Sequence, residues 1–274
     1  MENNLFSIKD KVIFVTGAFG LIGKEISKSF LSQGAKVVMA DINKAAIPVI
    51  SEEMAAVYNP SDFLVLELDI TNEESVEKAI ASTVSAFGKL DVLINNAAID
   101  AKFDKENTSK VNQSRFEYYP IDLLRRSVEV NLTGTVIMTQ HACRQMLTQG
   151  SGNIINVAST YSIVSPNQSL YDYGAGVTNF KPVDYIASKS FIPNFTRYVA
   201  TFYAKDNIRC NAIVPHGVLN NHEDAFLLDF SKMSPLGRMC DREELNGPFS
   251  FLASEASSYI TGSVLMVDGG WTAW

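Results

Sequence analysis

Two side chains that could move a proton lie four positions apart in the segment YIASK, which runs from Tyr185 to Lys189. Residues at this spacing project from the same face of a helix, so we expect the two side chains to be neighbours. An ammonium group beside a phenol favours the phenolate, and it is expected to lower the tyrosine pKa from its ordinary value of about 10. Tyr185 is therefore a candidate acid/base for catalysis near neutral pH.

Two further polar residues could serve the same reaction. Ser159 ends a predicted strand over Asn153–Ser159, where its hydroxyl could hydrogen-bond a reacting hydroxyl or carbonyl group. Asn131 lies within a long predicted helix over Ile121–Gln149, an unfavourable position for asparagine unless its side chain has a task. Each residue alone could be an ordinary surface or strand-end residue. The whole set on one frame predicts an active site.

Short apolar runs alternate with helix-length amphipathic segments along the chain. Strands are predicted over Val12–Thr16, Lys36–Asp41, Phe63–Leu68, Leu90–Asn95, Asn153–Ser159, Ile208–Val214 and Val264–Val267. Helices are predicted over about Leu21–Gln33, after Thr71, over Ile121–Gln149 and from about Val183. Buried strands separated by helices are typical of a Rossmann-type, doubly wound parallel sheet in an α/β fold, with helices on both faces. We expect residues 1–274 to form a single domain, with a catalytic and substrate half over about 101–274.

The start of the second predicted helix carries a capping pattern. Thr71 could cap the helix, and Glu74 follows three residues later, as in a capping box.

The first strand–helix junction, TGAFGLIG, indicates a dinucleotide site. Glycines from Gly17 to Gly23 allow a pyrophosphate to approach the backbone, and the following helix contributes free N–H groups. Asp41 ends the second strand, where its carboxylate could accept both ribose hydroxyls of NAD and repel the 2′-phosphate of NADP. We therefore expect NAD as the cofactor. The alternative for Asp41 is a cap for the next helix.

Two more strand ends extend this predicted site. Asp69 could meet the adenine amino group or cap the following helix, and the small residues of NNAA could let a ribose approach closely. The predicted cofactor-binding residues in these segments are Gly17, Phe19, Gly20, Leu21, Ile22, Gly23, Asp41, Asp69, Ile70, Asn95 and Ala97. They place the NAD-binding half of the chain at about 9–100.

Composition excludes several classes of function. A net charge of −7 argues against non-specific nucleic-acid binding. Three cysteines at wide spacing suit neither a disulfide framework nor, with the three histidines, a metal site, so no metal is expected. The polar N-terminus lacks the features of a signal peptide, and no apolar run reaches transmembrane length. We expect a cytoplasmic protein that acts on a small molecule, without a membrane or nucleic-acid partner.

The motifs together resemble the short-chain dehydrogenase/reductase family. The resemblance rests on TGAFGLIG, Asp41, Asp69-Ile70, NNAA, Asn131, Ser159, YIASK, NAIVPHG and YITGSVLMVDGG, and it extends from about residue 9 to the C-terminus.

This resemblance implies a role for each candidate catalytic residue. Tyr185 would be the general acid/base, and Lys189 would hold the nicotinamide ribose and lower the tyrosine pKa. Ser159 would orient the substrate oxygen, Asn131 would hold a water in a proton relay, and Pro215–Val218 would cover the nicotinamide. The resemblance thus adds Tyr185, Lys189, Pro215 and Val218 to the predicted cofactor-binding residues.

The chain departs from the family pattern in four places. Its glycines follow TGxxGxxG rather than TGxxxGxG, NNAA replaces the usual NNAG, and His216 stands where glycine is common. The interval between Ser159 and Tyr185 is also unusually long. The insertion 160–182 is therefore expected to form a wall of the substrate cleft.

Polar side chains in two long segments suggest a hydroxylated and possibly anionic substrate, unless they are merely solvated. These side chains are Tyr161, Asn167, Gln168, Tyr171, Tyr173, Asn179 and Lys181 in the insertion, and Lys102, Lys105, Lys110 and Arg115 in the loop 101–119. Three longer stretches, SLYDYGAGVTNFKPVDYIASK, PHGVLNNHEDAF and SSYITGSVLMVDGGWTAW, are similar to bacterial flagellin-modification oxidoreductases. That resemblance implies a sugar or nucleotide-activated sugar, such as a nonulosonic acid, in surface-glycan biosynthesis.

Other interpretations remain open from the sequence. The glycine spacing also suits a nucleotide-sugar epimerase or dehydratase with tightly held NAD, and a non-catalytic dinucleotide-sensing module is a third possibility. The resemblance also implies a homotetramer or homodimer that pairs the helices Ile121–Gln149 and Val183–Ala204 between subunits. Trp271 and Trp274 could pack on a neighbouring subunit or reach the substrate pocket.

Overall fold

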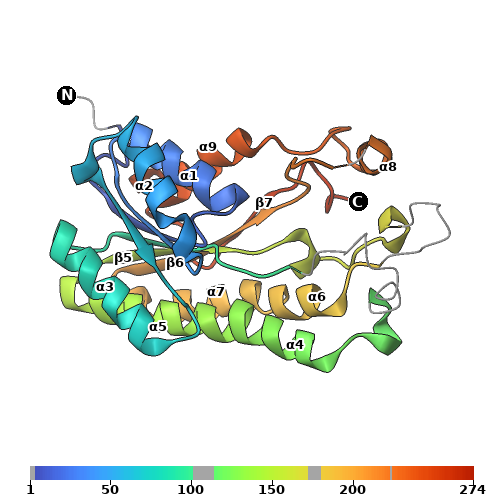
Figure 1. The fold of residues 1–274 in the computed structure, drawn as a ribbon, viewed down its shortest axis with the longest axis horizontal. Helices are drawn as coiled ribbons and strands as arrows, with labels where there is room; N and C mark the ends of the chain where they lie inside the picture. Colours follow the sequence, from blue (N-terminus) through green and yellow to red (C-terminus); the bar gives the residue numbers. More distant parts are fainter. Residues whose placement is uncertain (1–3, 101–113, 172–179, 223) are drawn as a thin grey trace.

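A computed structural model describes residues 4–100, 114–171, 180–222 and 224–274 of the chain (Figure 1). Within these residues the strands form one parallel sheet of seven, in the order β3-β2-β1-β4-β5-β6-β7. The strands are β1 Val12–Thr16, β2 Lys36–Asp41, β3 Phe63–Glu67, β4 Val92–Asn95, β5 Gly152–Val157, β6 Ile208–Pro215 and β7 Val264–Val267. This confirms the predicted doubly wound sheet.

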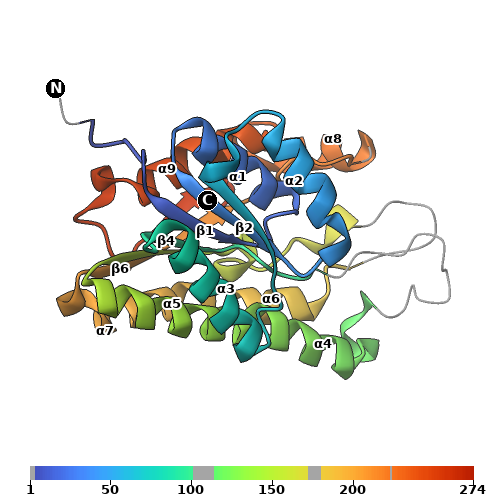
Figure 2. The same cartoon turned by 60° about the vertical axis from the view of Figure 1, so that its left-hand side comes forward.

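Helices cover both faces of the sheet. They are α1 Leu21–Ser32, α2 Ile47–Ala55, α3 Glu73–Phe87, α4 Ile121–Val128, α5 Thr135–Gln149, α6 Val183–Lys189, α7 Ile192–Phe202, α8 Asp224–Met233 and α9 Asn246–Ala253. Helices α1, α2 and α9 lie on one face, and α3 to α7 lie on the other, as both views show (Figures 1 and 2). None of the described helices is long and apolar enough to cross a membrane.

Alternation along the central strand supplies both hydrophobic layers. Ile13 and Val15 of β1 belong to the core that α1 closes with Phe30, whereas Phe14 belongs to the core on the opposite face. All four side chains are fully buried. A strand buried on both faces must be apolar at every position, which explains the continuous run VIFVT.

The chain reverses its direction of winding beside β1. This strand pairs with β2 on one side and β4 on the other, so the loops that follow β1 and β4 leave toward opposite faces. In open α/β sheets, ligands bind in the crevice that this divergence leaves at the carboxyl ends of the strands. The topology therefore places the glycine turn, Asn96 and Ala97 around one opening.

The predicted continuous helix over Ile121–Gln149 is wrong in its centre. A π-helical segment, Glu129–Gly134, separates α4 from α5. The wider turn contains Asn131, whose amide bonds both the N–H and the C=O of Ile99 at 2.8 and 2.9 Å. The apolar spacing continues through the segment, so periodicity alone does not reveal this single widened turn.

The predicted cap of α3 is displaced by one residue. Asn72 caps the helix by accepting a hydrogen bond from the Ser75 N–H at 2.9 Å. Thr71 instead donates from its backbone and its hydroxyl to Asp69. Either side chain could cap a helix, and the turn made by Asp69 decides which one does.

Candidate active site

The glycine turn is packed against the end of β4. Gly17 has a φ of 63°, and a Cβ at this position would lie 2.7 Å from the Ala97 Cα. A Cβ on Gly23 would lie 2.3 Å from the Gly17 carbonyl oxygen. The Asn96 amide donates to the carbonyls of Thr16 and Gly17, both at 3.0 Å. The turn therefore requires glycine at both positions to lie this close to the neighbouring strand.

Asp41 faces this turn from the end of β2. One carboxylate oxygen accepts a hydrogen bond from the Phe19 N–H at 3.1 Å, and the other accepts from the Asn43 N–H at 3.0 Å. The side chain lines the cleft described below. Asp41 therefore holds the glycine turn, makes a local turn of its own and still presents a carboxylate to a ligand.

One cleft of about 560 Å³ runs from the glycine turn to the predicted catalytic residues. Of the predicted site residues, those that line it are Gly17, Gly20, Leu21, Ile22, Asp41, Ala97, Ser159, Tyr185, Lys189, Pro215 and Val218. Those that do not line it are Phe19, Gly23, Asp69, Ile70, Asn95 and Asn131.

The structure moves the predicted cofactor-site residue at the end of β4 by one position, from Asn95 to Asn96. Its side chain is buried on the far face of β4 and donates to Thr139 at 2.9 Å and Asn156 at 2.8 Å. Asn96 lines the cleft instead. Successive strand residues point to opposite faces, so the alternation of the buried strand could have assigned Asn96 rather than Asn95.

The other residues outside the cleft support its walls. Asp69 uses one carboxylate oxygen for the backbone and hydroxyl of Thr71, at 2.9 and 2.7 Å. Ile70 packs so closely on Gly134 that a Cβ there would lie 2.7 Å from it. Phe19 packs against the core below α1. The contact between Ile70 and Gly134 has no sequence signal, because it joins segments from different parts of the chain.

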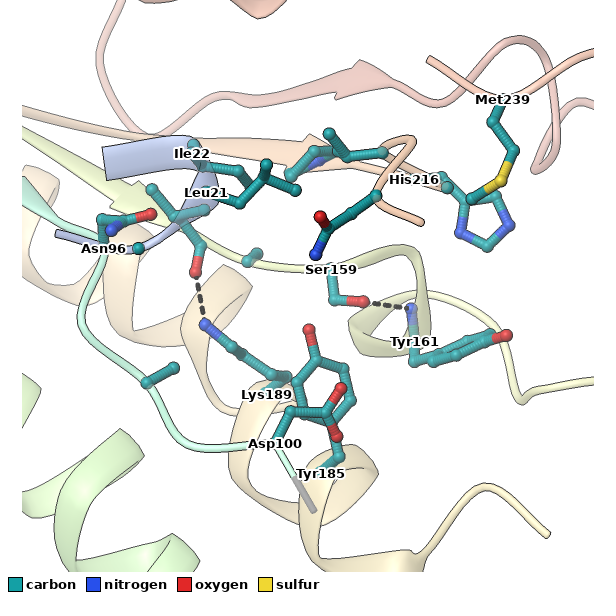
Figure 3. Close-up of a pocket in the computed structure, with 18 of the residues that line it drawn as sticks. Leu21, Ile22, Asn96, Asp100, Ser159, Tyr161, Tyr185, Lys189, His216 and Met239 are labelled. Carbon is teal, nitrogen blue, oxygen red and sulfur yellow. Dashed lines mark hydrogen bonds between the residues drawn. The ribbon is translucent and has the colours of Figure 1, made fainter. Parts of the chain in front are cut away.

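Tyr185, Lys189 and Ser159 meet at the other end of the cleft (Figure 3). Tyr185 and Lys189 lie on α6, and the Lys189 ammonium donates to the Val157 carbonyl at 2.8 Å. Ser159 follows β5 by two residues, and its hydroxyl accepts from the Tyr161 N–H at 3.2 Å. Lys189 is 5% exposed and Ser159 is 7% exposed, so both polar groups are shielded from water.

The pKa of Tyr185 differs from the sequence-based expectation. Burial raises this pKa above its ordinary value, the Asp100 carboxylate raises it further, and a hydrogen bond from Ser159 partly opposes both. Burial lowers the pKa of Lys189 to about 8. The sequence predicts a lowered tyrosine pKa, whereas in the protein without cofactor the shift is upward, with burial as its largest cause.

Asn131 lies behind the site rather than in it. Besides its two bonds to Ile99, its amide donates to the Ser188 hydroxyl at 2.9 Å. The side chain is 1% exposed. It therefore ties the segment after β4 to the helix that carries Tyr185, and its role in a proton relay stays a prediction.

The insertion 160–182 contributes a wall of the cleft. Its described residues that line the cleft are Tyr161, Leu170, Tyr171 and Lys181. Gln168 fixes Lys181 by bonding its backbone N–H and C=O at 2.8 and 3.3 Å. The residues singled out in the sequence that lie outside the described part are Lys102, Lys105, Lys110, Tyr173 and Asn179.

His216 stands in an aromatic cluster at the same end. Its ring lies 4.3 Å from Trp271 and 5.1 Å from Phe230, centroid to centroid, and its Nδ1 is hydrogen-bonded to the Thr160 hydroxyl. Burial lowers the pKa of His216 to about 4, so the ring is neutral at physiological pH. Trp271 thus packs within its own chain, whereas Trp274 is 83% exposed.

Comparisons with known proteins agree with this geometry. The chain matches a family described as Enoyl-(Acyl carrier protein) reductase over residues 17–272. It is also 35% identical to the NAD-dependent glycerol dehydrogenase of Listeria innocua, over 97% of this chain and 96% of that protein. The chain belongs to the short-chain dehydrogenase/reductase family. The predictions of the family and of an oxidoreductase are confirmed.

Two further proteins are similar over nearly the whole chain. It is 29% identical to Post-translational flagellin modification protein A of Campylobacter coli, over 96% of this chain and 99% of that protein. A short chain dehydrogenase from Leptospira borgpetersenii, solved with bound NAD+, is 30% identical and has a TM-score of 0.83, covering 99% of this chain and 96% of that one.

The tight packing of the glycine turn generates a stability prediction. Gly23→Ala is expected to destabilise the protein by about 1–3 kcal/mol, because the new methyl group meets the Gly17 carbonyl oxygen. Gly20→Ala is the matched control, since a Cβ there lies 3.4 Å from the same oxygen, and its effect should stay within about 0.5 kcal/mol. Urea unfolding of both variants checks this. Equal stability of the two variants would contradict the packing described.

Proposed function

We propose that this protein is an NAD-dependent oxidoreductase that transfers a hydride to or from a carbon bearing a hydroxyl or carbonyl group. The observation that carries the proposal is the convergence of Tyr185, Lys189 and Ser159 in one cleft with the glycine turn and Asp41. Acid/base groups at one end and a dinucleotide cradle at the other are the two parts that such a reaction needs.

The described residues fit NAD. Gly17 and Gly20 line the cleft with backbone alone, and the start of α1 offers backbone N–H groups to a pyrophosphate. Asp41 would accept the ribose hydroxyls, and Lys189 would hold the nicotinamide ribose. Bound NAD supplies the hydride acceptor or donor. The NAD-dependent Listeria relative and the NAD+-bound Leptospira structure support this assignment.

The chain's own residues handle the proton and the orientation of the substrate. Tyr185 accepts the hydroxyl proton during oxidation and returns it during reduction. Ser159 hydrogen-bonds the same substrate oxygen and holds it beside the phenol. Lys189 is held by its hydrogen bond to the Val157 carbonyl and lies beside Tyr185. From there its ammonium would stabilise negative charge on the Tyr185 phenol oxygen.

We further propose that the substrate is a sugar or nucleotide-activated sugar, such as a nonulosonic acid, in surface-glycan biosynthesis. The flagellin-modification relative from Campylobacter coli supports this class, and the glycerol dehydrogenase relative supports a polyhydroxylated substrate. The insertion, which lines the cleft beside Tyr185, is placed to select it. A screen of sugars, nucleotide sugars and CMP-activated nonulosonates with NAD and NADH, followed at 340 nm, identifies the compound.

We also propose a cytoplasmic homotetramer or homodimer. Four large apolar side chains, Ile121, Leu123, Tyr198 and Phe202, are exposed on α4 and α7. These helices lie on one side of the sheet and are those expected to pair between subunits (Figure 2).

Removal of one hydroxyl tests the catalytic assignment. Tyr185→Phe is expected to lower kcat by at least about a hundredfold, since positioned acid/base catalysis contributes this much, while NADH binding changes little. Tyr259→Phe, at a fully exposed tyrosine, is the control. Absorbance at 340 nm and NADH fluorescence report the two quantities. Full turnover by Tyr185→Phe would refute the assignment, and turnover without net NADH change would favour the epimerase alternative.

Charge at the end of β2 sets the expected cofactor preference. Asp41→Asn keeps an acceptor for the Phe19 N–H but removes the charge that repels a 2′-phosphate. We expect the ratio of kcat/KM for NADP to that for NAD to rise about tenfold or more. Asp206→Asn, on an exposed turn, should leave the ratio unchanged. An unchanged ratio in Asp41→Asn would show that this carboxylate does not face the ribose.

The two pKa shifts predict how the rate depends on pH. Because the pKa of Tyr185 is raised, the phenol is protonated at neutral pH and its base form increases as pH rises. The kcat/KM for alcohol oxidation should therefore increase from about pH 6 to 8, whereas that for carbonyl reduction should stay level. Above about pH 8, loss of charge on Lys189 should lower both rates. Oxidation that is independent of pH over this range would contradict the assignment.

A further inference from the structure

An ion pair outside the predicted catalytic set lies against the ring of Tyr185. The Lys181 ammonium lies 2.7 and 2.6 Å from the two carboxylate oxygens of Asp100. The same nitrogen lies 4.2 Å from the centroid of the Tyr185 ring. Both members of the pair line the cleft, and the Asp100 carboxylate lies beside the Tyr185 side chain (Figure 3).

This pair is held in place from both sides. Gln168 bonds the backbone of Lys181 through its side-chain amide. Asp100 follows Ile99, whose backbone is fixed by Asn131. The Lys181 side chain is only 10% exposed, so it remains in the wall instead of extending into water.

The charges of Lys181 and Asp100 cancel, so the pair favours a neutral ligand group over a charged one. A substrate anion would have to compete with Asp100 for Lys181, and a cation would have to compete with Lys181 for Asp100. A hydroxyl group has neither problem. An ammonium has three N–H donors and a carboxylate has about four lone-pair sites, so the intact pair can still donate to one hydroxyl and accept from another.

Much of the remaining lining at this end of the cleft is aromatic and uncharged. It includes Tyr161 and Tyr171, whose hydroxyl oxygens are 2.8 Å apart and hydrogen-bonded to each other, and Phe226, whose ring centroid lies 6.3 Å from that of Tyr171. His216 lies in the same lining, stacked on Phe230, as a neutral ring. Such a surface packs against the C–H face of a ring and offers little to an anion.

From the ion pair and this aromatic lining we infer that the Asp100–Lys181 pair is a diol-recognition element, which binds a hydroxyl adjacent to the reacting carbon while the aromatic lining covers the carbon skeleton. The inference rests on the proposed function and narrows its substrate to vicinal diols and ring polyols that are uncharged at the reacting end. Lys181 and Asp100 are thus specificity residues that touch the substrate.

The test compares matched substrates that differ by one hydroxyl. Oxidation of cis-1,2-cyclohexanediol and of cyclohexanol, and of glycerol and 2-propanol, is followed at 340 nm with saturating NAD for the wild type and for Lys181→Met. The wild type should favour each diol or polyol over its monohydric partner by about tenfold or more in kcat/KM, and Lys181→Met should remove that preference. Lys232→Met breaks a surface Lys–Asp pair on α8 and should leave it intact.

Three further outcomes separate the possible failures. An equal loss on the diol and monohydric partners in Lys181→Met, with a shifted pH profile, would mean that Lys181 acts only through Tyr185, and it would overturn the inference. A wild type without preference for the diols would overturn it as well. A wild-type protein that neither oxidises any alcohol with NAD nor reduces any carbonyl with NADH would contradict the proposed function itself.

Saturation-transfer NMR of the NADH complex is an independent test of binding. It should show that the wild type binds the polyols and that Lys181→Met weakens this binding. Absence of polyol binding to the wild type would overturn the inference.

Discussion

The contact between the glycine turn and the end of β4 is the constraint on which the site depends. Gly17 approaches Ala97 so closely that no side chain fits between them, and Asn96 bonds the turn across the same gap. The connections that follow β1 and β4 leave this point toward opposite faces of the sheet. The contact therefore defines one end of an open cleft, with the start of α1 beside it. A looser turn would fill the space that a dinucleotide needs.

The catalytic end is tied to this contact through one short segment. The chain leaves β4 at Asn96 and reaches Ile99, where Asn131 holds its backbone and also bonds Ser188 on α6. The next residue, Asp100, then meets Lys181. The same segment therefore supports the glycine turn, the helix of Tyr185 and the wall of the substrate pocket, so the two ends of the cleft cannot shift independently.

The sequence was sufficient to predict the sheet, the glycine turn and the position of Tyr185 and Lys189, because these follow from local periodicity and spacing. The sequence was insufficient where contacts between distant segments determine the position or the pKa of a side chain. The assignment of Asn95 instead of Asn96 failed because one step of strand alternation moves a side chain to the opposite face. The tyrosine pKa was expected to fall, but burial and the Asp100 carboxylate raise it. The pairing of Lys181 joins segments far apart in the chain and has no local pattern.

We propose that one cleft holds NAD along the glycine turn, with its nicotinamide beside Tyr185. A crystal structure of the complex with NADH tests this proposal most directly. We expect it to show the adenosine ribose hydroxyls on the Asp41 carboxylate, the nicotinamide ribose on Lys189, and the nicotinamide ring beside Tyr185 and Ser159. An NADH molecule bound away from Asp41 or with its nicotinamide far from Tyr185 would contradict it.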